Sequence, residues 1–197
     1  MNDLRIKNRI ESKFIISNHV KYSIIDILET ANITQFYHVC SDYYETINRD
    51  FLLQKKEGNF QKIKLRKRVY NNDTSFFEVK VKNGEVSFKQ RFINISCAWS
   101  YIQSISLQKT STLIPYPLTR VEYNRAAIDV NKGLRLTFDS NIVYKDLMTC
   151  KVDATTQYCI LEVKSLSPPD WLIQLLHKKG LKQEPFSKYH EAHERTK

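Results

Sequence analysis

Apolar and polar residues alternate with a period of two along much of the chain, and this pattern predicts β-strands with one buried face. In residues 62–69 basic side chains alternate with apolar ones, and the same alternation returns in 76–82 and 86–91. Asn83-Gly84 stands between the last two segments and is typical of a tight hairpin turn. The three segments therefore predict an antiparallel meander.

Further alternating segments occur at 9–14, around 123–125, at 134–139 and at 161–164. Together with residues 37–44 they bring the expected number of strands to about eight. Eight antiparallel strands are enough to close a barrel.

Three segments have the spacing of amphipathic helices, at 20–28, 99–105 and 171–176. The last one has the clearest limits, because Pro168-Pro169-Asp170 precedes it and Gly180 follows it. We expect these helices to cover the apolar face of the sheet.

Two tryptophans and the C-terminal tail are expected to have structural rather than functional roles. Trp99 and Trp171 occur at helical spacing with Ile and Leu, so both are expected to pack in the core. His190 and His193 have the i, i+3 spacing of two zinc ligands, but they do not form an HExxH motif. The tail is therefore expected to be a solvated terminal helix.

The charged faces of the strands contain mainly Arg and Lys, with a single Glu in the same register over 62–91. One explanation is that each is the solvated side of a sheet packed on helices. If the strands close into a barrel, however, these cations converge on its lumen. Each pair then repels by about 4 kcal/mol at 4 Å and an effective dielectric constant near 20, so bound anions or interspersed carboxylates are needed. The pattern predicts a polyanionic ligand.

The length of the chain predicts a single domain, and its net charge agrees with a polyanionic ligand. The chain has 197 residues with 42% hydrophobic and 12% aromatic residues, which predicts a single domain over 1–197. No apolar run approaches the roughly 20 residues of a membrane-spanning helix. Lys and Arg number 31 against 21 Asp and Glu, so the net charge is +10, and the pI is about 9.4. This balance favours nucleic acid, polyphosphate, nucleotides or an anionic membrane surface as partners.

The glycine and cysteine content limits how the chain could bind phosphate and where it is expected to function. The chain has only four Gly and no glycine-rich phosphate loop, so side chains would have to bind any phosphate. Its four Cys never approach CxxC spacing, and the N-terminus lacks an apolar signal core. These features predict a reducing, cytoplasmic location.

Nine short motifs occur in strand-like spacing and in a specific order. They are Arg9-x-Glu11-x-Lys13, Ser41-x-Tyr43-Tyr44-Glu45-Thr46, Lys64-x-Arg66-x-Arg68, Phe77-Glu78-Val79-Lys80, Lys89-x-Arg91, Tyr123-x-Arg125, Arg135-x-Thr137-x-Asp139, Leu161-Glu162-Val163-Lys164 and Phe186-Ser187-Lys188-Tyr189. Together they resemble the VTC (vacuolar transporter chaperone) domain, the polyphosphate polymerase branch of the CYTH-like triphosphate tunnel metalloenzymes. The resemblance runs from about residue 5 to residue 190.

This resemblance implies an α+β fold that is mainly antiparallel β, an eight-stranded closed barrel or tunnel with a basic lumen and helices packed outside. It also implies a polyphosphate polymerase that transfers the γ-phosphate of ATP onto a growing inorganic polyphosphate chain. The implied phosphate-binding residues are Lys13, Arg66, Arg68, Lys80, Lys89, Arg91, Arg125, Arg135, Lys164 and Lys188.

The resemblance also implies a divalent metal, commonly Mn²⁺ with Mg²⁺ as the other candidate, on the carboxylate of Glu162. Glu11 and Glu78 are second candidates, either as metal ligands or as groups that orient lysines. The residues expected to act in catalysis are Arg66, Arg68, Lys80, Arg125 and Glu162. Phosphoryl transfer suits such a set, because it needs positioning and electrostatic stabilisation more than a nucleophilic side chain.

The second motif departs from the family. Where family members typically have Ser-Leu-Tyr-Phe-Asp-Thr, this chain has Ser41-Asp42-Tyr43-Tyr44-Glu45-Thr46, so a longer glutamate replaces the aspartate. The charge is kept, while the reach of the carboxylate changes.

Several alternatives stay open. An inorganic triphosphatase, a thiamine triphosphatase or a cyclase of the same class would use a similar lumen, although those relatives usually begin with Glu-x-Glu-x-Lys and here Arg9 replaces the first Glu. A non-catalytic polyphosphate-binding module is another candidate. Nucleic acid is not expected, because stacking aromatics are not interleaved with the basic positions. Export of a polymer would need a separate membrane partner, which would bring the protein to the cytoplasmic face of a membrane.

Overall fold

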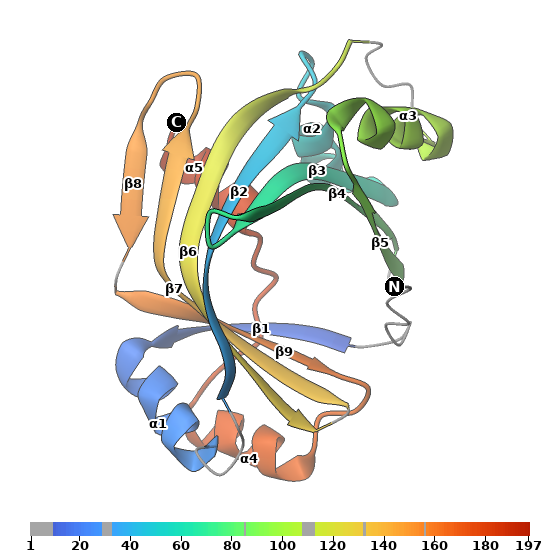
Figure 1. The fold of residues 1–197 in the computed structure, drawn as a ribbon. Helices are drawn as coiled ribbons and strands as arrows, with labels where there is room; N and C mark the ends of the chain where they lie inside the picture. Colours follow the sequence, from blue (N-terminus) through green and yellow to red (C-terminus); the bar gives the residue numbers. More distant parts are fainter. Residues whose placement is uncertain (1–9, 29–32, 85, 108–112, 132, 156) are drawn as a thin grey trace. The chain divides into compact units, whose positions relative to one another are not determined.

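The computed structural model describes residues 10–28, 33–84, 86–107, 113–131, 133–155 and 157–197. Its elements in chain order are β1 (Ile10–Ser17), α1 (Asn18–Leu28), β2 (Ile33–Glu45), α2 (Asp50–Lys56), β3 (Gln61–Tyr70), β4 (Thr74–Asn83), β5 (Val86–Phe92), α3 (Ile95–Ile105), β6 (Tyr116–Asn131), β7 (Leu134–Asp146), β8 (Val152–Thr155), β9 (Tyr158–Ser165), α4 (Asp170–Lys178) and α5 (Lys188–Arg195). Figure 1 shows them along the chain.

The strands form one sheet in the order β1-β9-β7-β6-β2-β3-β4-β5, and β8 pairs with β7 outside this path. The pairs β1–β9, β2–β3, β3–β4, β4–β5 and β7–β9 are all antiparallel. This confirms the predicted α+β fold with mainly antiparallel strands. The described sheet has nine strands rather than eight, because the short β8 follows a turn after β7.

The chain divides into two compact units. The first comprises Met1–Tyr37, Tyr123–Ile142 and Ala154–Phe186, and the second comprises His38–Glu122, Val143–Asp153 and Ser187–Lys197. The strands β2, β6 and β7 contribute residues to both units. The single domain predicted over 1–197 stays a prediction.

The first unit packs helices α1 and α4 on the apolar face of β1, β9, β7 and β6 (Figure 1). Ile24 of α1 and Leu172 of α4 are fully buried beside Phe138 and Leu161 of the strands. Phe14, Leu161 and Phe138 are cross-strand neighbours, so they line one face. The opposite face carries the charged residues, as the alternation predicts.

In the second unit, α2 and α3 pack on the apolar face of β3 and β4. Helix α3 begins after Asn94, whose side chain accepts a hydrogen bond from the backbone N–H of Cys97 at 2.9 Å. It places Trp99 and Ile102 against Val79, so the core position expected for Trp99 is confirmed. Between β4 and β5, Gly84 has a φ of +56°, which a tight hairpin turn requires.

Two local predictions need correction. Trp171 is 40% exposed, because Leu172 and Leu176 are the α4 residues turned to the core. The C-terminal helix α5 is not fully solvated, since it buries Tyr189 and His193.

The four-residue β8 and the seven-residue α2 have no counterpart among the predicted elements. Both are too short to show a hydrophobic period. Among the described residues, no helix is long and apolar enough to cross a membrane.

Leu136→Ala is expected to lower the free energy of unfolding by about 2 to 5 kcal/mol, because Leu136 is fully buried in the core of the first unit. Urea denaturation followed by circular dichroism measures the change. Ile10→Ala is the control, since Ile10 is 55% exposed and its loss should change stability by about 0.5 kcal/mol or less. Equal losses in both variants would contradict the assignment of this core.

Candidate functional site

Three strands of the second unit place eight basic side chains on one face. Cross-strand register aligns Lys64 with Lys80 and Lys80 with Lys89, and the next row aligns Arg66 with Glu78 and Glu78 with Arg91. Residues directly opposite each other in an antiparallel pair lie on the same face. We call the rows around Glu78 the basic face, which consists of Lys64, Arg66, Arg68, Lys80, Lys89 and Arg91, and Lys62 pairs with Lys82 in a further row beyond it.

Glu78 is the single carboxylate of the basic face, and its side chain is fully buried. It forms a short ion pair with Arg66, and its Oε2 atom lies 3.5 Å from Lys89 Nζ and 3.8 Å from Arg91 Nε. Burial alone would raise the pKa of this carboxyl. The positive charges of Arg66, Lys89 and Arg68 outweigh that effect and lower the pKa of Glu78 to about 2. Glu78 is therefore a fixed anion among the cations.

Aromatic and hydroxyl groups orient the arginines of this face. Arg66 Nη1 donates to the hydroxyl of Tyr43 at 3.2 Å, and Arg68 Nε donates to Ser41 Oγ at 3.1 Å. Arg91 lies over the ring of Phe76, 4.3 Å from its centroid. Burial would raise the pKa of Tyr43, but Arg66 and Arg68 lower it below its usual range. The guanidinium groups are thus held in defined directions.

The charged face of the first unit carries matched ion pairs. Arg125 holds Asp139 with two hydrogen bonds, of 2.5 and 2.7 Å, and both side chains are largely buried. Burial would lower the pKa of Arg125, and Asp139 raises it well above its usual value. Lys164 Nζ lies 2.8 Å from Glu162 Oε1, and Arg125 Nη2 lies 4.0 Å from Glu162 Oε2.

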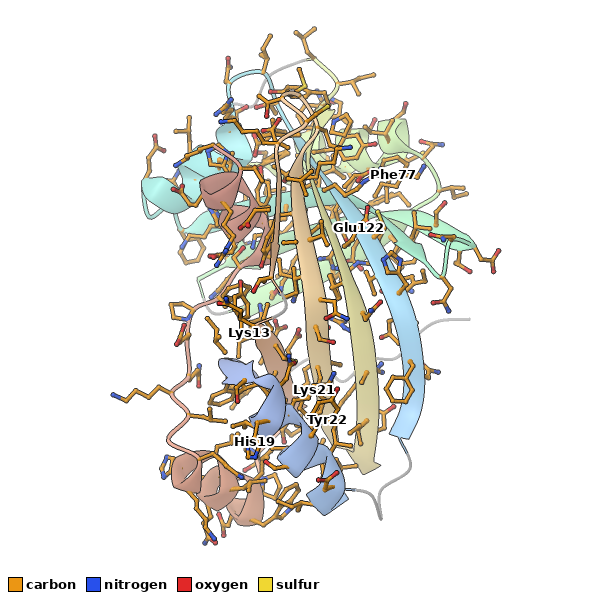
Figure 2. The ribbon with its side chains drawn as sticks, turned by 90° about the vertical axis from the view of Figure 1, so that its left-hand side faces the viewer. Lys13, His19, Lys21, Tyr22, Phe77 and Glu122 are labelled. Carbon is orange, nitrogen blue, oxygen red and sulfur yellow. The ribbon has the colours of Figure 1, made fainter. Side chains whose placement is uncertain are left out.

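Two further pairs lie on the same face of the first unit. Lys13 on β1 (Figure 2) lies 3.1 Å from Glu11, and Arg135 lies 3.7 Å from Asp129. Register places Lys13 beside Glu162, and Glu11 beside Lys164. In these ion pairs of the first unit each cation has its own carboxylate. The basic face of the second unit, in contrast, has one carboxylate for six cations.

A buried carboxyl group lies at the end of β2. Glu45 accepts a short hydrogen bond from the hydroxyl of Tyr189 on α5 and another from the backbone N–H of Phe51 at 3.3 Å. Burial raises the pKa of Glu45 to about 7, more than these hydrogen bonds lower it. The glutamate that departs from the family motif is therefore a buried structural acid.

The structure brings most predicted residues together within their own units. Lys80, Lys89 and Arg91 join Arg66 and Arg68 on the basic face of the second unit. Lys13, Arg125, Arg135, Lys164, Glu162 and Glu11 share the charged face of the first unit. Lys188 lies at the start of α5 in the second unit and contributes to the lowered pKa of Tyr43. Arg9 lies outside the described residues.

Three residues of the site were missed as functional candidates. Asp139 binds Arg125, and the alternation of Arg135-x-Thr137-x-Asp139 already placed it on the charged face. Glu45 and Tyr189 stood in the quoted motifs without a role, and no local signal joins two residues 144 positions apart.

The arrangement of the carboxylates limits how a metal ion could be bound. Within the part of the chain that the structure describes, no group of three or more His, Cys, Asp or Glu side chains could hold a metal ion. Mg²⁺ is commonly bound through one or two carboxylates plus substrate phosphates. Glu162, with Glu11 on the same face, fits that mode. Glu78 fits the role of orienting Arg66 and Lys89 better, because three cations surround it.

Comparison with known proteins identifies the fold and the family. Residues 5–196 match the family model described as the VTC domain. No curated protein sequence matches the chain. A solved structure from Pyrococcus horikoshii is 16% identical, with a TM-score of 0.58 over 94% of this chain and 96% of its own.

Two further solved structures are described as putative cyclases. One, from Hippeastrum, is reported in its description to have a dominant triphosphatase activity; it is 14% identical, with a TM-score of 0.66 over 96% of this chain and 97% of its own. The other, from Bacillus halodurans, is 16% identical, with a TM-score of 0.54 over 92% of this chain and 95% of its own. At these identities the likeness shows the fold alone.

Glu78→Gln is expected to lower the free energy of unfolding by about 3 to 5 kcal/mol, because it removes the carboxylate that compensates the surrounding cations. Inorganic triphosphate should then stabilise the variant more than the wild type, since an anion that binds the folded state replaces the lost charge. Thermal unfolding with and without triphosphate measures both effects. In the control Asp129→Asn, an exposed pair is lost and the change should stay below about 1 kcal/mol. No added stabilisation of Glu78→Gln by triphosphate would contradict an anion site here.

Glu45→Gln is expected to flatten the pH dependence of stability between pH 5 and 8. The pKa of Glu45 is about 7 in the folded chain and near 4.5 in its ordinary state, so the folded chain binds more protons in this window and stability falls as the pH rises. The full shift corresponds to about 3 kcal/mol. Urea denaturation at pH 5 and pH 8 should show the variant gaining stability relative to the wild type at pH 8. Parallel profiles would contradict the raised pKa.

Proposed function

This chain belongs to the VTC domain family, and on that premise we propose that it is a metal-dependent phosphotransferase that adds the γ-phosphate of ATP to inorganic polyphosphate. The observation that carries the proposal is the excess of six cations over one carboxylate on the basic face. The proposal includes a closed tunnel, in which the eight strands on the path would turn their charged faces inward.

Electrostatics favours a polyanion on this face. Neighbouring cations repel by about 4 kcal/mol per pair at 4 Å and an effective dielectric constant near 20. Glu78 compensates only part of that repulsion, because it pairs with Arg66 and lies near Lys89 and Arg91. A chain of phosphates supplies many negative charges in a row, whereas a single carboxylate ligand does not.

The side chains also suit the reaction. Phosphoryl transfer spreads charge over peripheral phosphate oxygens, and catalysis consists largely of positioning and electrostatic stabilisation. Arg66 and Arg68 would offer planar forks to these oxygens, and Lys80 a compact point charge. A phosphate chain end is already anionic, so a strong general base is dispensable.

The family implies a divalent metal, and Glu162 with Glu11 would hold it together with substrate oxygens. When bound, Mn²⁺ or Mg²⁺ would neutralise charge on the transferred phosphate. Lys164 and Arg125 keep the carboxylate of Glu162 in place. We assign the remaining basic residues to phosphate binding, namely Lys13, Lys89, Arg91, Arg135 and Lys188.

A triphosphatase or cyclase of the same fold is the second candidate. It is favoured by Glu11 and Glu162, two carboxylates on adjacent strands β1 and β9 that a hydrolase metal would use. The triphosphatase activity reported for the Hippeastrum neighbour belongs to the same fold. A polyphosphate-binding module without catalysis is the third outcome that the experiment distinguishes.

The proposed reaction takes place in the cytoplasm with ATP and polyphosphate as its partners and without nucleic acid. Polymer export would require a separate membrane partner, which would place the protein at the cytoplasmic face of a membrane.

The deciding experiment incubates the protein with ATP and either Mn²⁺ or Mg²⁺ and measures polyphosphate, orthophosphate and cyclic AMP together. Polyphosphate accumulating with ADP is the expected result. Orthophosphate or cyclic AMP alone would replace the polymerase with a hydrolase or cyclase, and tight polyphosphate binding without turnover would leave a binding module. Glu162→Ala should abolish turnover and keep the fold.

Lys80→Ala separates ligand binding from stability. Its direct cross-strand neighbours are Lys64 and Lys89, so removing its charge relieves repulsion and should not lower the unfolding temperature. Affinity for triphosphate should fall about tenfold, as expected when one phosphate-binding cation is lost. Lys67→Ala is the matched control, because Lys67 lies on the opposite face of β3. Equal affinities in the two variants would contradict phosphate binding at Lys80.

A further inference from the structure

A chain of side chains in the second unit joins the C-terminal helix to the basic face. It begins at Glu45, which is fully buried at the end of β2. One carboxylate oxygen accepts a hydrogen bond from the hydroxyl of Tyr189, and the other accepts one from the backbone N–H of Phe51 at 3.3 Å. Glu45 therefore fixes where the phenol of Tyr189 points.

The ring of Tyr189 continues this chain to β2. It stacks on the ring of Tyr43 with a centroid distance of 4.9 Å and an angle of 17° between the ring planes. Both rings are buried, with 1% of Tyr189 and 4% of Tyr43 exposed. A buried stack of two aromatic rings restricts rotation of both side chains, so the position of Tyr189 determines that of Tyr43.

The Tyr43 hydroxyl then holds Arg66. Arg66 Nη1 donates to it at 3.2 Å, while Nη2 pairs with Glu78, and the guanidinium carbon lies 5.8 Å from the centre of the Tyr43 ring. The guanidinium is thus fixed by Tyr43 and by Glu78.

We propose that Glu45 and Tyr189 are positioning residues that set the direction of the Arg66 guanidinium through the stacked ring of Tyr43. The proposal rests on the proposed function, in which Arg66 binds phosphate oxygens. A planar fork recognises phosphate only when both of its N–H groups point at the ligand, so a small rotation of Arg66 weakens binding.

The helix itself has other anchors. Arg195 near its end lies 2.9 Å from Asp153 and over the ring of Tyr144, and Lys64 Nζ donates to Ser187 Oγ at 2.8 Å just before its start. Loss of the Tyr189 contact therefore loosens Arg66 while α5 stays docked. Substitution of Tyr189 can therefore test the orientation of Arg66 without a general loss of structure.

The test is a double-mutant cycle with inorganic triphosphate as the probe, measured by calorimetry or, for weak binding, by phosphorus NMR titration. Tyr189→Leu should lower the affinity about tenfold in the wild-type background and by less than about twofold in the Arg66→Lys background, because the lysine has no fork to orient. In the Lys80→Ala background the full effect of Tyr189→Leu should persist. Tyr189→Phe, which keeps the ring and removes the hydroxyl, should have an intermediate effect.

Ile102→Ala is the stability control, since it damages the buried core of the same unit on the α3 side. It should leave the affinity for triphosphate unchanged in both backgrounds. The positioning role would be overturned if Tyr189→Leu lowered the affinity for triphosphate equally in the wild-type and Arg66→Lys backgrounds. It would also be overturned if Ile102→Ala lowered the affinity as much as Tyr189→Leu. A wild-type protein that does not bind triphosphate would instead overturn the proposed function and this inference with it.

Discussion

The buried carboxylate of Glu78 among the cations of the basic face is the interaction on which the site depends. A buried carboxylate is costly unless cations pair with it, and cations on adjacent strands repel one another unless an anion lies among them. Glu78 and its neighbours Arg66, Lys89 and Arg91 therefore stabilise each other. One carboxylate cannot balance six cations, and the remaining positive charge is what a polyanion would neutralise. The same excess of positive charge lowers the stability of the free protein and favours binding of a polyanion.

The two units differ in the balance between their cations and carboxylates. In the first unit each of the cations Lys13, Arg125, Arg135 and Lys164 lies close to a carboxylate. On the basic face of the second unit the cations are in excess. The proposed phosphoryl transfer would use both kinds of surface, because hard oxygen ligands suit a divalent ion and excess positive charge suits phosphate oxygens. The long strands β2, β6 and β7 supply residues to both units, so one sheet carries the two environments.

Aromatic residues give the basic face its rigidity. An arginine has a long flexible side chain, and its fork is useful only when neighbouring groups fix the plane. Tyr43 provides a hydroxyl for Arg66, and Phe76 provides a ring surface for Arg91. Tyr189 and Glu45 extend this support into the interior, where the substitution of glutamate for the family's aspartate lengthens the arm that reaches the phenol. Buried groups behind the basic face thus take part in building the site.

The sequence alone determined the longer strands and the composition of their faces, because the side chains of a strand alternate between its two sides whatever the rest of the chain does. This is why the charged positions of 62–69 and 134–139 were predicted correctly, and why the order of motifs identified the family. Only the tertiary structure decided which charges pair, that Glu45 is buried, and that the C-terminal helix covers Tyr43. Those outcomes depend on contacts between residues far apart in the chain, such as Tyr189 and Glu45, and burial and charge pairing arise only when folding brings such residues together.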